Sequence, residues 1–269
     1  MISFPHCKIN LGLHVAGKRS DGFHDLSSCF YPVPRTDILE IIPAQEFSFS
    51  LSGMEVLGAS EDNLCVKAYQ LIKKYFDISP AKIHLHKTIP IGAGLGGGSA
   101  DAAFTLRLLC QVFDLKISND QLKYYAAQLG SDCTFFLQDQ PMMGSGRGEI
   151  LSPTLVNLKG KQLVLVKPNI HISTSEAYEN ISPHRSTNSI DEILKSPVKE
   201  WRGKLKNDFE ESIFITHPAL GAVKEKLYLL GAMYSSMSGS GASVFGIFEK
   251  PVDLKKDFSR MDYWSGELK

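Results

Sequence analysis

The residues with the clearest chemical meaning form a glycine-rich segment, Pro90 to Ala103, which reads PIGAGLGGGSADAA. Five of the seven positions from 92 to 98 are glycine. Glycine readily adopts positive φ and lets the backbone approach a ligand, so successive N–H groups can turn toward one anion. We interpret Ser99 as the N-cap of the helix that follows, and the free donors at that helix end favour phosphate. The segment is therefore predicted to bind phosphate.

A flexible hinge is the alternative for this segment. Five ordered glycines carry a large entropy cost, and hinges rarely lie between a strand-like segment and a helix. The segment lacks the Gly-Lys-Ser/Thr ending of a Walker A motif, and no acidic residue follows at the spacing of a dinucleotide-binding fingerprint. Another residue must therefore supply positive charge to the phosphate.

Asp132 and Lys8 are the candidates for chemistry beside that phosphate. Asp132 follows Gly130-Ser131 at the end of a predicted helix, where its carboxylate could act on a hydroxyl as a general base. A cap or turn residue is the alternative. Lys8 lies in the alternating segment His6 to Leu13 and could keep a carboxylate ionised or stabilise an attacking alkoxide. Its alternative is a solvated lysine on an edge strand.

The composition is that of an ordinary globular protein of one large or two small domains. The 269 residues include 29 basic and 29 acidic side chains, so no net charge attracts nucleic acid or an anionic membrane. The five cysteines are widely spaced without a C-x-x-C pair, which argues against a disulfide framework or a zinc site. We find neither a signal-peptide pattern nor an uninterrupted apolar run long enough to span a bilayer. The expectation is a cytoplasmic protein without nucleic-acid or membrane partners.

The hydrophobic pattern alternates between strands and helices. Strands are expected at residues 38–42, 47–51, 83–85, 163–166 and 244–248. A helix over 64–75 would be capped by Asp62 or Asn63, another would start with a capping box of Ser118 and Gln121, and a third would cover 220–230. The weakly patterned stretch 182–198 is expected to be a long surface loop. Such alternation indicates an α+β protein with a domain boundary near 157–161.

Five segments, taken together and in order, resemble the motifs of the GHMP kinases. They are Lys8-Ile9-Asn10-Leu11, Asp21-Gly22-Phe23-His24, the loop 90–103, Gly130-Ser131-Asp132 and Ser238-Gly239-Ser240-Gly241. The resemblance covers about residues 5 to 250. It implies the two-domain GHMP kinase fold, with a ribosomal-protein-S5-domain-2-like αβ domain at 1–157 that binds ATP. A ferredoxin-like αβ domain at 158–269 would bind the second substrate.

The first two motifs point to the GHMP kinase that acts on a cytidyl diphosphate of methylerythritol, not on mevalonate, galactose or homoserine. The resemblance then implies ATP-dependent phosphorylation of the tertiary 2-hydroxyl, in the non-mevalonate route to isoprenoid precursors. Asp132 would be the base, and Lys8 would orient it and polarise the hydroxyl. Mg²⁺ would bridge the phosphates. Its protein ligand stays open, with Ser99 one candidate and Asp101 another, for which a helix-dipole role is the alternative.

The resemblance also implies two sets of binding residues. ATP would contact Asn63, Leu64, Pro90, Gly92, Gly94, Leu95, Gly96, Gly97, Gly98 and Ser99. The cytidyl substrate would contact Asn10, Phe23, His24, Asp132, Tyr178, Ser238, Gly239 and Ser240. His24 would bond the edge of the base, and Phe23 and Tyr178 would stack on its two faces. From the sequence alone, the favoured interpretation of both aromatic residues is that they are core residues, and only the resemblance favours stacking.

Two other functions remain compatible with these motifs. One is a different small-molecule GHMP kinase, and the other is a non-catalytic nucleotide-binding member of the fold, such as a sensor or an RNA-binding relative. The zero net charge and the presence of both Lys8 and Asp132 argue against the second. The segment Gly144 to Glu149 resembles one that closes over the site, although Arg147 is equally compatible with a turn.

Overall fold

The computed structural model describes residues 1–55, 58–179, 181 and 189–269, and its chain forms two compact units. The first unit comprises residues 1–7, 35–91 and 96–139, and the second comprises 8–34, 92–95 and 140–269. The glycine-rich segment thus contributes its central residues 92–95 to the second unit and its two ends to the first. The expected boundary near 157 falls within the second unit, and the division into 1–157 and 158–269 stays a prediction.

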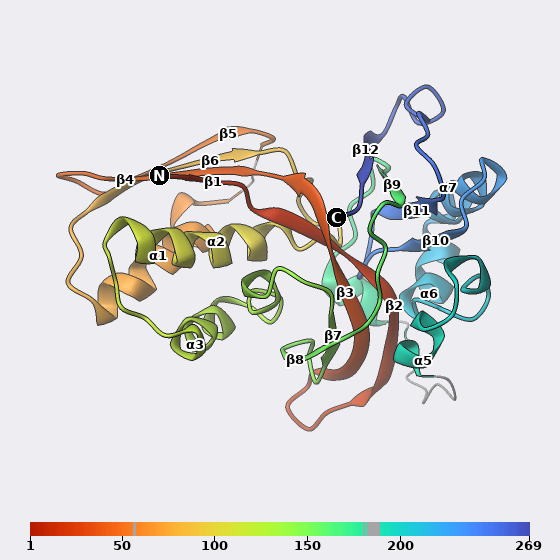
Figure 1. The fold of residues 1–269 in the computed structure, drawn as a ribbon, viewed down its shortest axis with the longest axis horizontal. Helices are drawn as coiled ribbons and strands as arrows, with labels where there is room; N and C mark the ends of the chain where they lie inside the picture. Colours follow the sequence, from red (N-terminus) through yellow and green to blue (C-terminus); the bar gives the residue numbers. More distant parts are fainter. Residues whose placement is uncertain (56–57, 180, 182–188) are drawn as a thin grey trace. The chain divides into compact units, whose positions relative to one another are not determined.

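A four-stranded sheet forms the first unit, in the order β1-β4-β6-β5. Its strands are Ile2–Ser3, Ile38–Pro43, Ala81–Lys87 and Ser48–Gly53. Strand β4 is antiparallel to β6, and β5 is parallel to it. Helices α1 (Leu64–Tyr75) and α2 (Gly97–Val112) cover one face of this sheet (Figure 1), and α3 (Asn119–Leu129) packs on both helices. The buried side chains of β4, β6 and these helices form one core, as the predicted patterns require.

In the first unit, side-chain caps set the starts of α1 and α3, whereas the backbone conformation of a glycine sets the start of α2. Asn63 caps α1 by accepting from the Cys65 N–H, and Ser118 forms the expected capping box with Gln121. The prediction that Ser99 caps α2 is wrong. That helix begins earlier, because Gly96 takes the left-handed conformation at φ 70° and its carbonyl already accepts from Ala100.

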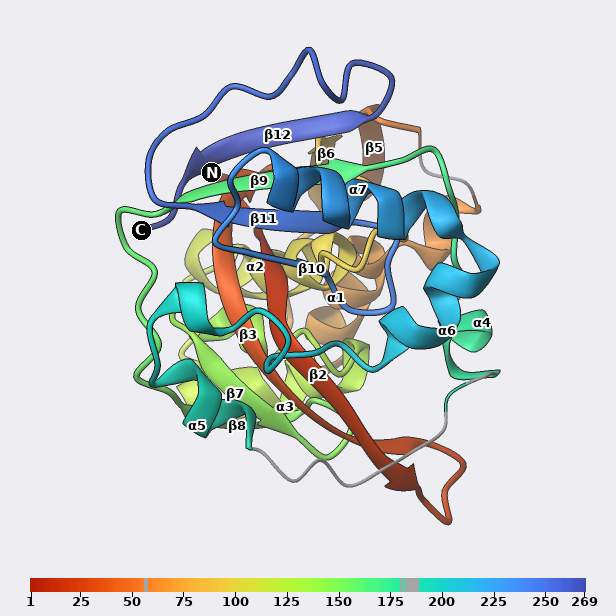
Figure 2. The ribbon, with the colours of Figure 1, turned by 90° about the vertical axis from the view of Figure 1, so that its right-hand side faces the viewer.

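Two sheets form the second unit. The antiparallel sheet β10-β11-β9-β12 contains Tyr234–Met237, Val244–Phe248, Gln162–Lys167 and Asp262–Glu267. Helix α7 (Pro218–Leu229) packs on β10 and β11 (Figure 2), and α6 (Phe209–Thr216) packs on α7. The sheet β2-β3-β7-β8 contains His6–Lys18, His24–Thr36, Met142–Ser145 and Ile150–Pro153. Strand β2 carries the first sequence motif, and the second lies in the turn between β2 and β3 and ends at His24, the first residue of β3.

The predicted surface loop at 182–198 is partly wrong. Residues 182–188 lie outside the described part of the chain, but Ile190–Leu194 forms helix α5. Ile190, Ile193 and Leu194 recur at helical spacing and are all buried, so burial of this short apolar face stabilises the helix. The other short helical elements are α4 (Thr174–Glu179) and the 3₁₀ turns Ser60–Asp62, Phe135–Leu137 and Val198–Glu200. In the described ranges no helix is long and apolar enough to span a bilayer.

Candidate active site

Strand β2 brings two buried polar side chains, Lys8 and Asn10, into the second unit. Lys8 is 4% exposed and Asn10 is 2% exposed, so the alternative of a solvated edge lysine is wrong. The Lys8 ammonium donates to the Asn10 Oδ1 at 2.6 Å and to the Gly94 carbonyl at 3.1 Å. The Asn10 Nδ2 in turn donates to the Ser28 hydroxyl at 2.8 Å. A buried cation is therefore fixed against the centre of the glycine-rich segment.

The turn Ser238–Gly241 packs directly on that segment. Gly94 has φ +72°, and a Cβ there would lie 1.9 Å from the Ser238 carbonyl oxygen, so only glycine permits the approach. The Ser238 hydroxyl donates to the Gly94 carbonyl at 2.8 Å and accepts from the Asn10 N–H at 3.3 Å. The Ser243 N–H donates to the Ala93 carbonyl. Lys8, Asn10, Gly94 and the turn thus form one cluster, although hundreds of residues separate some of them in the sequence.

In the first unit, the start of α2 lies beside the predicted adenine contacts. Gly96 to Gly98 open the helix, and the position of a Gly98 Cβ is 3.8 Å from the Leu64 Cδ1. Leu64 is the first residue of α1, directly after its cap Asn63. Helix N-termini expose unpaired N–H groups and carry partial positive charge, which suits a phosphate group.

Asp132 lies in the turn after α3, close to the same helix start. Gly130 ends α3, and Asp132 is half-buried and accepts from the Phe135 N–H through its carbonyl. The Ser99 hydroxyl lies 3.9 Å from where a Gly130 Cβ would be. Burial raises the pKa of the neighbouring Cys133 thiol to about 12, and its hydrogen bond with Ser99 opposes that shift. The first unit thus brings Ser99 and the turn of Asp132 together.

The sequence patterns did not predict a buried ionic triad in the first unit. The Lys87 ammonium bonds to Asp37 and, at 2.7 Å, to Asp101. Asp37 also accepts from the N–H groups of Thr88 and Ile89. The helix-dipole alternative for Asp101 is wrong, because its carboxylate is buried against Lys87. The only available signal was a lysine shortly before the glycines and an aspartate shortly after them.

The aromatic residues predicted to bind cytidine make two separate ring contacts in the second unit. His24 stacks on Tyr178 with ring centroids 4.7 Å apart and planes 19° apart. Phe23 is 53% exposed, and the Arg147 guanidinium lies 4.8 Å from its ring centroid. The core alternative is therefore wrong for Phe23. That Phe23 and Tyr178 stack on opposite faces of one base stays a prediction.

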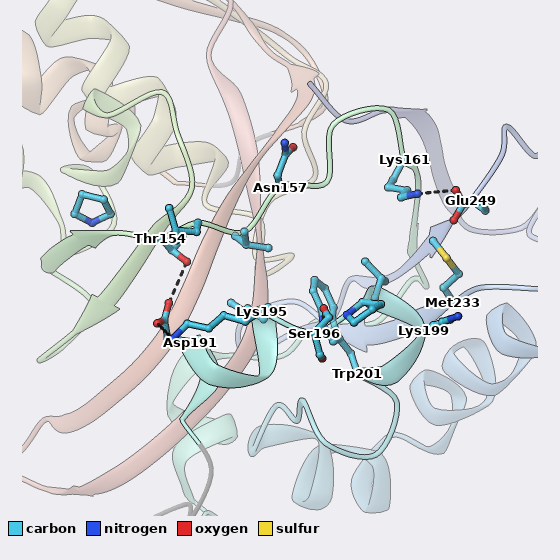
Figure 3. Close-up of a pocket in the computed structure, with 16 residues that line it drawn as sticks. Thr154, Asn157, Lys161, Asp191, Lys195, Ser196, Lys199, Trp201, Met233 and Glu249 are labelled. Atoms are coloured by element: carbon cyan, nitrogen blue, oxygen red, sulfur yellow. Dashed lines mark hydrogen bonds and ion pairs between the residues drawn. The ribbon is translucent and has the colours of Figure 1, made fainter.

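The second unit also contains a large cavity. It has a volume of about 800 Å³ and lies between the β8 end, α5 and Trp201 (Figure 3). Lys161 and Glu249 form an ion pair of 2.6 Å at its rim, and Asp191 accepts from the Thr154 hydroxyl. None of the predicted ATP or substrate residues lines it.

Two family models match the chain. The model described as the GHMP kinases N terminal domain matches residues 63–146, which include the glycine-rich segment and Asp132. The model described as GHMP kinases C terminal matches residues 189–264, which include the turn Ser238–Gly241. The fold agrees with a Methanococcus jannaschii mevalonate kinase at a TM-score of 0.73 and 16% identity, over 100% of this chain and 98% of that one. The chain is a GHMP kinase, a small-molecule kinase that uses ATP.

Relatives with higher sequence identity show which kind of GHMP kinase this chain is. The chain is 53% identical over 253 residues to the 4-diphosphocytidyl-2-C-methyl-D-erythritol kinase of Bacteroides thetaiotaomicron, covering 93% of this chain and 92% of the relative. It is 49% identical to the same kinase of Cytophaga hutchinsonii, covering 97% of both. A crystal structure of 4-(cytidine 5'-diphospho)-2C-methyl-D-erythritol kinase matches with a TM-score of 0.83 and 29% identity, covering 99% of this chain and 98% of that one. The chain belongs to the 4-diphosphocytidyl-2-C-methyl-D-erythritol kinase family.

Proposed function

We propose that this chain transfers the γ-phosphoryl group of ATP to the 2-hydroxyl of 4-diphosphocytidyl-2-C-methyl-D-erythritol, in the non-mevalonate route to isoprenoid precursors. The observation that carries the proposal is the buried Lys8 ammonium, which is bonded to the Gly94 carbonyl of a segment suited to phosphate. Phosphoryl transfer depends mainly on positioning and on stabilising charge, and this cluster offers both. The choice of substrate is supported by the names of relatives that the chain matches over more than nine-tenths of its length.

Asp132 is the proposed general base. Its carboxylate would accept the proton of the 2-hydroxyl while that oxygen forms a bond to the γ-phosphorus. The bond from this phosphorus to the bridging oxygen would break, and ADP would leave with the electron pair. Lys8 and the N–H groups of the glycine-rich segment would stabilise the negative charge on the reacting oxygens.

The two substrates have separate proposed contacts. Asn63, Leu64, Pro90 and the segment Gly92–Ser99 would bind ATP. The cytosine would meet Phe23, His24 and Tyr178, and its diphosphate and sugar would meet Asn10 and the turn Ser238–Ser240. The stacked pair of His24 and Tyr178 supports an aromatic site in this place.

Mg²⁺ is proposed to bind chiefly through the phosphates of ATP, whose charge it would neutralise when bound. The described residues contain no group of three His, Cys, Asp or Glu side chains that could hold a metal by itself. A site with few protein ligands suits Mg²⁺, which usually takes one or two of them together with phosphate oxygens and water. Ser99 is the proposed protein ligand, since Asp101 is held by Lys87.

ADP release by the purified protein, supplied with ATP, Mg²⁺ and the cytidyl substrate, tests this function. The Asp132→Asn variant is expected to lose turnover by about three orders of magnitude or more while it still binds ATP. Asp120→Asn, at an exposed position on α3, is the matched control and should retain full turnover. Turnover with mevalonate or homoserine alone would indicate another GHMP kinase, and no turnover with any substrate would indicate a non-catalytic member.

A further inference from the structure

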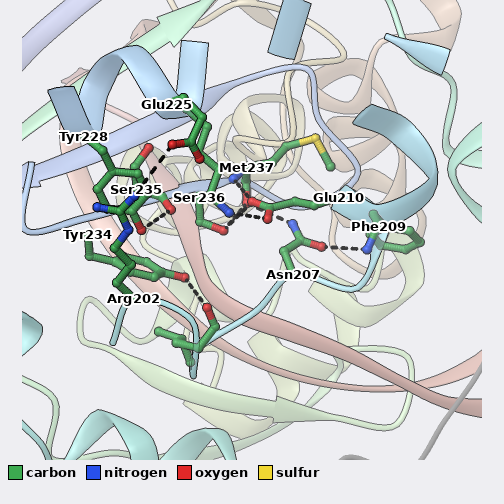
Figure 4. A network of polar contacts seen from close by, with 12 residues as sticks. Arg202, Asn207, Phe209, Glu210, Glu225, Tyr228, Tyr234, Ser235, Ser236 and Met237 are labelled. Atoms are coloured by element: carbon green, nitrogen blue, oxygen red, sulfur yellow. Dashed lines mark hydrogen bonds and ion pairs between the residues drawn. The ribbon is translucent and has the colours of Figure 1, made fainter. Parts of the chain in front are cut away.

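The segment Asn207–Glu210 contains two buried polar side chains to which the function above gives no role. Asn207 is 2% exposed and Glu210 is 9% exposed, at the start of α6. Figure 4 shows both side chains directed toward the end of β10, which leads into the turn Ser238–Gly241. Buried polar groups are costly unless they are fully hydrogen-bonded, so their partners define what they hold in place.

Asn207 holds the turn through its side-chain amide. Its Nδ2 donates to the Met237 carbonyl and to the Gly239 carbonyl, both at 2.8 Å. Its Oδ1 accepts from the Phe209 N–H at 3.1 Å. The two carbonyls flank Ser238, so one amide group fixes the backbone on both sides of that residue.

Glu210 holds the strand end immediately before the turn. Its Oε1 accepts from the Ser236 hydroxyl at 2.8 Å and from the Met237 N–H at 2.7 Å. Its Oε2 pairs with the Lys224 ammonium of α7 at 2.5 Å. Bonds to a charged acceptor are stronger than neutral ones, so this carboxylate anchors Met237 firmly.

The same segment is also tied to strand β2. The Leu13 N–H donates to the Lys206 carbonyl, and the Asp208 N–H donates to the Leu13 carbonyl, both at 2.9 Å. The Asp208 carboxylate accepts from the Val15 N–H at 2.8 Å. Residues 206–210 therefore join the strand that carries Lys8 and Asn10 to the turn that packs on Gly94.

We propose that Asn207 and Glu210 are positioning residues for the nucleoside-diphosphate substrate. They act by fixing the backbone of Met237, Ser238 and Gly239, so that the turn keeps the shape in which it would meet the diphosphate. The proposal rests on the proposed function, in which this turn contacts the cytidyl diphosphate. A displacement of about 1 Å in such a group can lower the rate about a hundredfold.

Asn207→Asp tests the proposal with almost no change in volume. The new carboxylate cannot donate when it is ionised, and it would face two carbonyl oxygens. We expect the KM for the cytidyl diphosphate to rise at least about tenfold and kcat/KM to fall about a hundredfold. The KM for ATP should change less than about threefold, because the ion pair of Asp101 with Lys87 holds the start of α2 independently of Asn207. Asn157→Asp is the matched control at an exposed position and should leave both constants unchanged.

A second pair of variants decides the question if Asn207→Asp does not fold. Glu210→Gln keeps the oxygen that accepts from Met237, whereas Glu210→Ala removes it. We expect the KM for the cytidyl diphosphate to rise in the alanine variant and to stay within about threefold of wild type in the glutamine variant.

The results of these experiments distinguish a failure of the positioning proposal from a failure of the proposed function. Wild-type protein that does not turn over the cytidyl diphosphate would overturn the proposed function. If the wild type is active, three results would overturn the positioning role alone. These are unchanged KM values in the variants, equal rises for both substrates, and a lowered Tm without any kinetic change.

Discussion

At the scale of single residues, the strongest electrostatic feature is the triad of Asp37, Lys87 and Asp101. Two carboxylates share one buried ammonium, and the Asp101 Oδ1 has no hydrogen-bond partner in the described residues. Burial raises the pKa of Asp101 from 3.8 to about 7; Lys87 opposes that shift and Asp37 adds to it. The nearby carboxylates outweigh burial for Lys87 and raise its pKa, so the ammonium stays charged.

The raised pKa predicts how stability depends on pH. The folded protein binds the Asp101 proton more tightly than the unfolded chain does. This contribution to stability is therefore fully present below about pH 4 and is lost as the pH rises through about 7. Between pH 5 and pH 8 we expect the free energy of unfolding of wild type to fall relative to Asp101→Asn, by about 1 kcal/mol or more. Urea unfolding at several pH values measures this difference, and a difference independent of pH would contradict the assignment.

At the scale of elements, the triad and the turn hold the glycine-rich segment at different points. Lys87 ends β6 just before the segment, and Asp101 lies in α2 near the end of the segment, so their ion pair joins its two ends. The turn Ser238–Gly241 holds its centre at Ala93 and Gly94. A loop of glycines needs such contacts, because its conformational entropy otherwise favours many backbone states over the one that binds phosphate.

Gly94→Ala tests the packing of the segment on the turn. A Cβ at this position would meet the Ser238 carbonyl at 1.9 Å, and the φ of +72° is strained for alanine. We expect kcat/KM to fall at least about a hundredfold, with a loss of stability of about 1 kcal/mol or more. Gly17→Ala is the matched control, since no atom lies within 4 Å of its Cβ position. Steady-state kinetics and thermal unfolding of both variants give the comparison, and a fully active Gly94→Ala would refute it.

At the scale of the whole molecule, each compact unit has a hydrophobic core of its own, and free cysteines occur in both units. All five are free thiols, with four buried and Cys110 half-buried. Burial raises the pKa of Cys110 to about 11 and raises the pKa of Cys29 and Cys65 further. A thiol reacts as its thiolate. Burial limits access of a reagent to these side chains and also suppresses their ionisation, so it protects them while the protein is folded.

Reaction with a disulfide reagent checks this protection. In native protein at pH 8 we expect at most one thiol, Cys110, to react within minutes. In denaturant all five should react at once. Several fast thiols in the native state would mean that the cores open readily, because local unfolding would then have to expose the buried cysteines.

Features that depend on residues close together in the chain could be predicted from the sequence. Asn63 and the Ser118–Gln121 box were recognisable because a cap bonds to N–H groups two or three residues away. Strand and helix periods predicted β4, β6, β9, β11, α1 and α7 for the same reason. The ordered motifs were sufficient to indicate the GHMP kinase family. The start of α2 was misjudged because the left-handed Gly96 ended the loop before Ser99.

Contacts between groups that lie far apart in the sequence could be identified only in the folded chain. Lys8 contacts Gly94, and Asn207 contacts Gly239, across separations in sequence that leave no periodic or local signal. Asp101 looked like an ordinary residue of a first helical turn until Lys87 and Asp37 were found beside it. Burial, which fixes the charge state of Asp101 and the cost of leaving Glu210 unpaired, is a property of the packed chain. The sequence therefore specified the chemistry that is available, and packing specified which residues are positioned to carry it out.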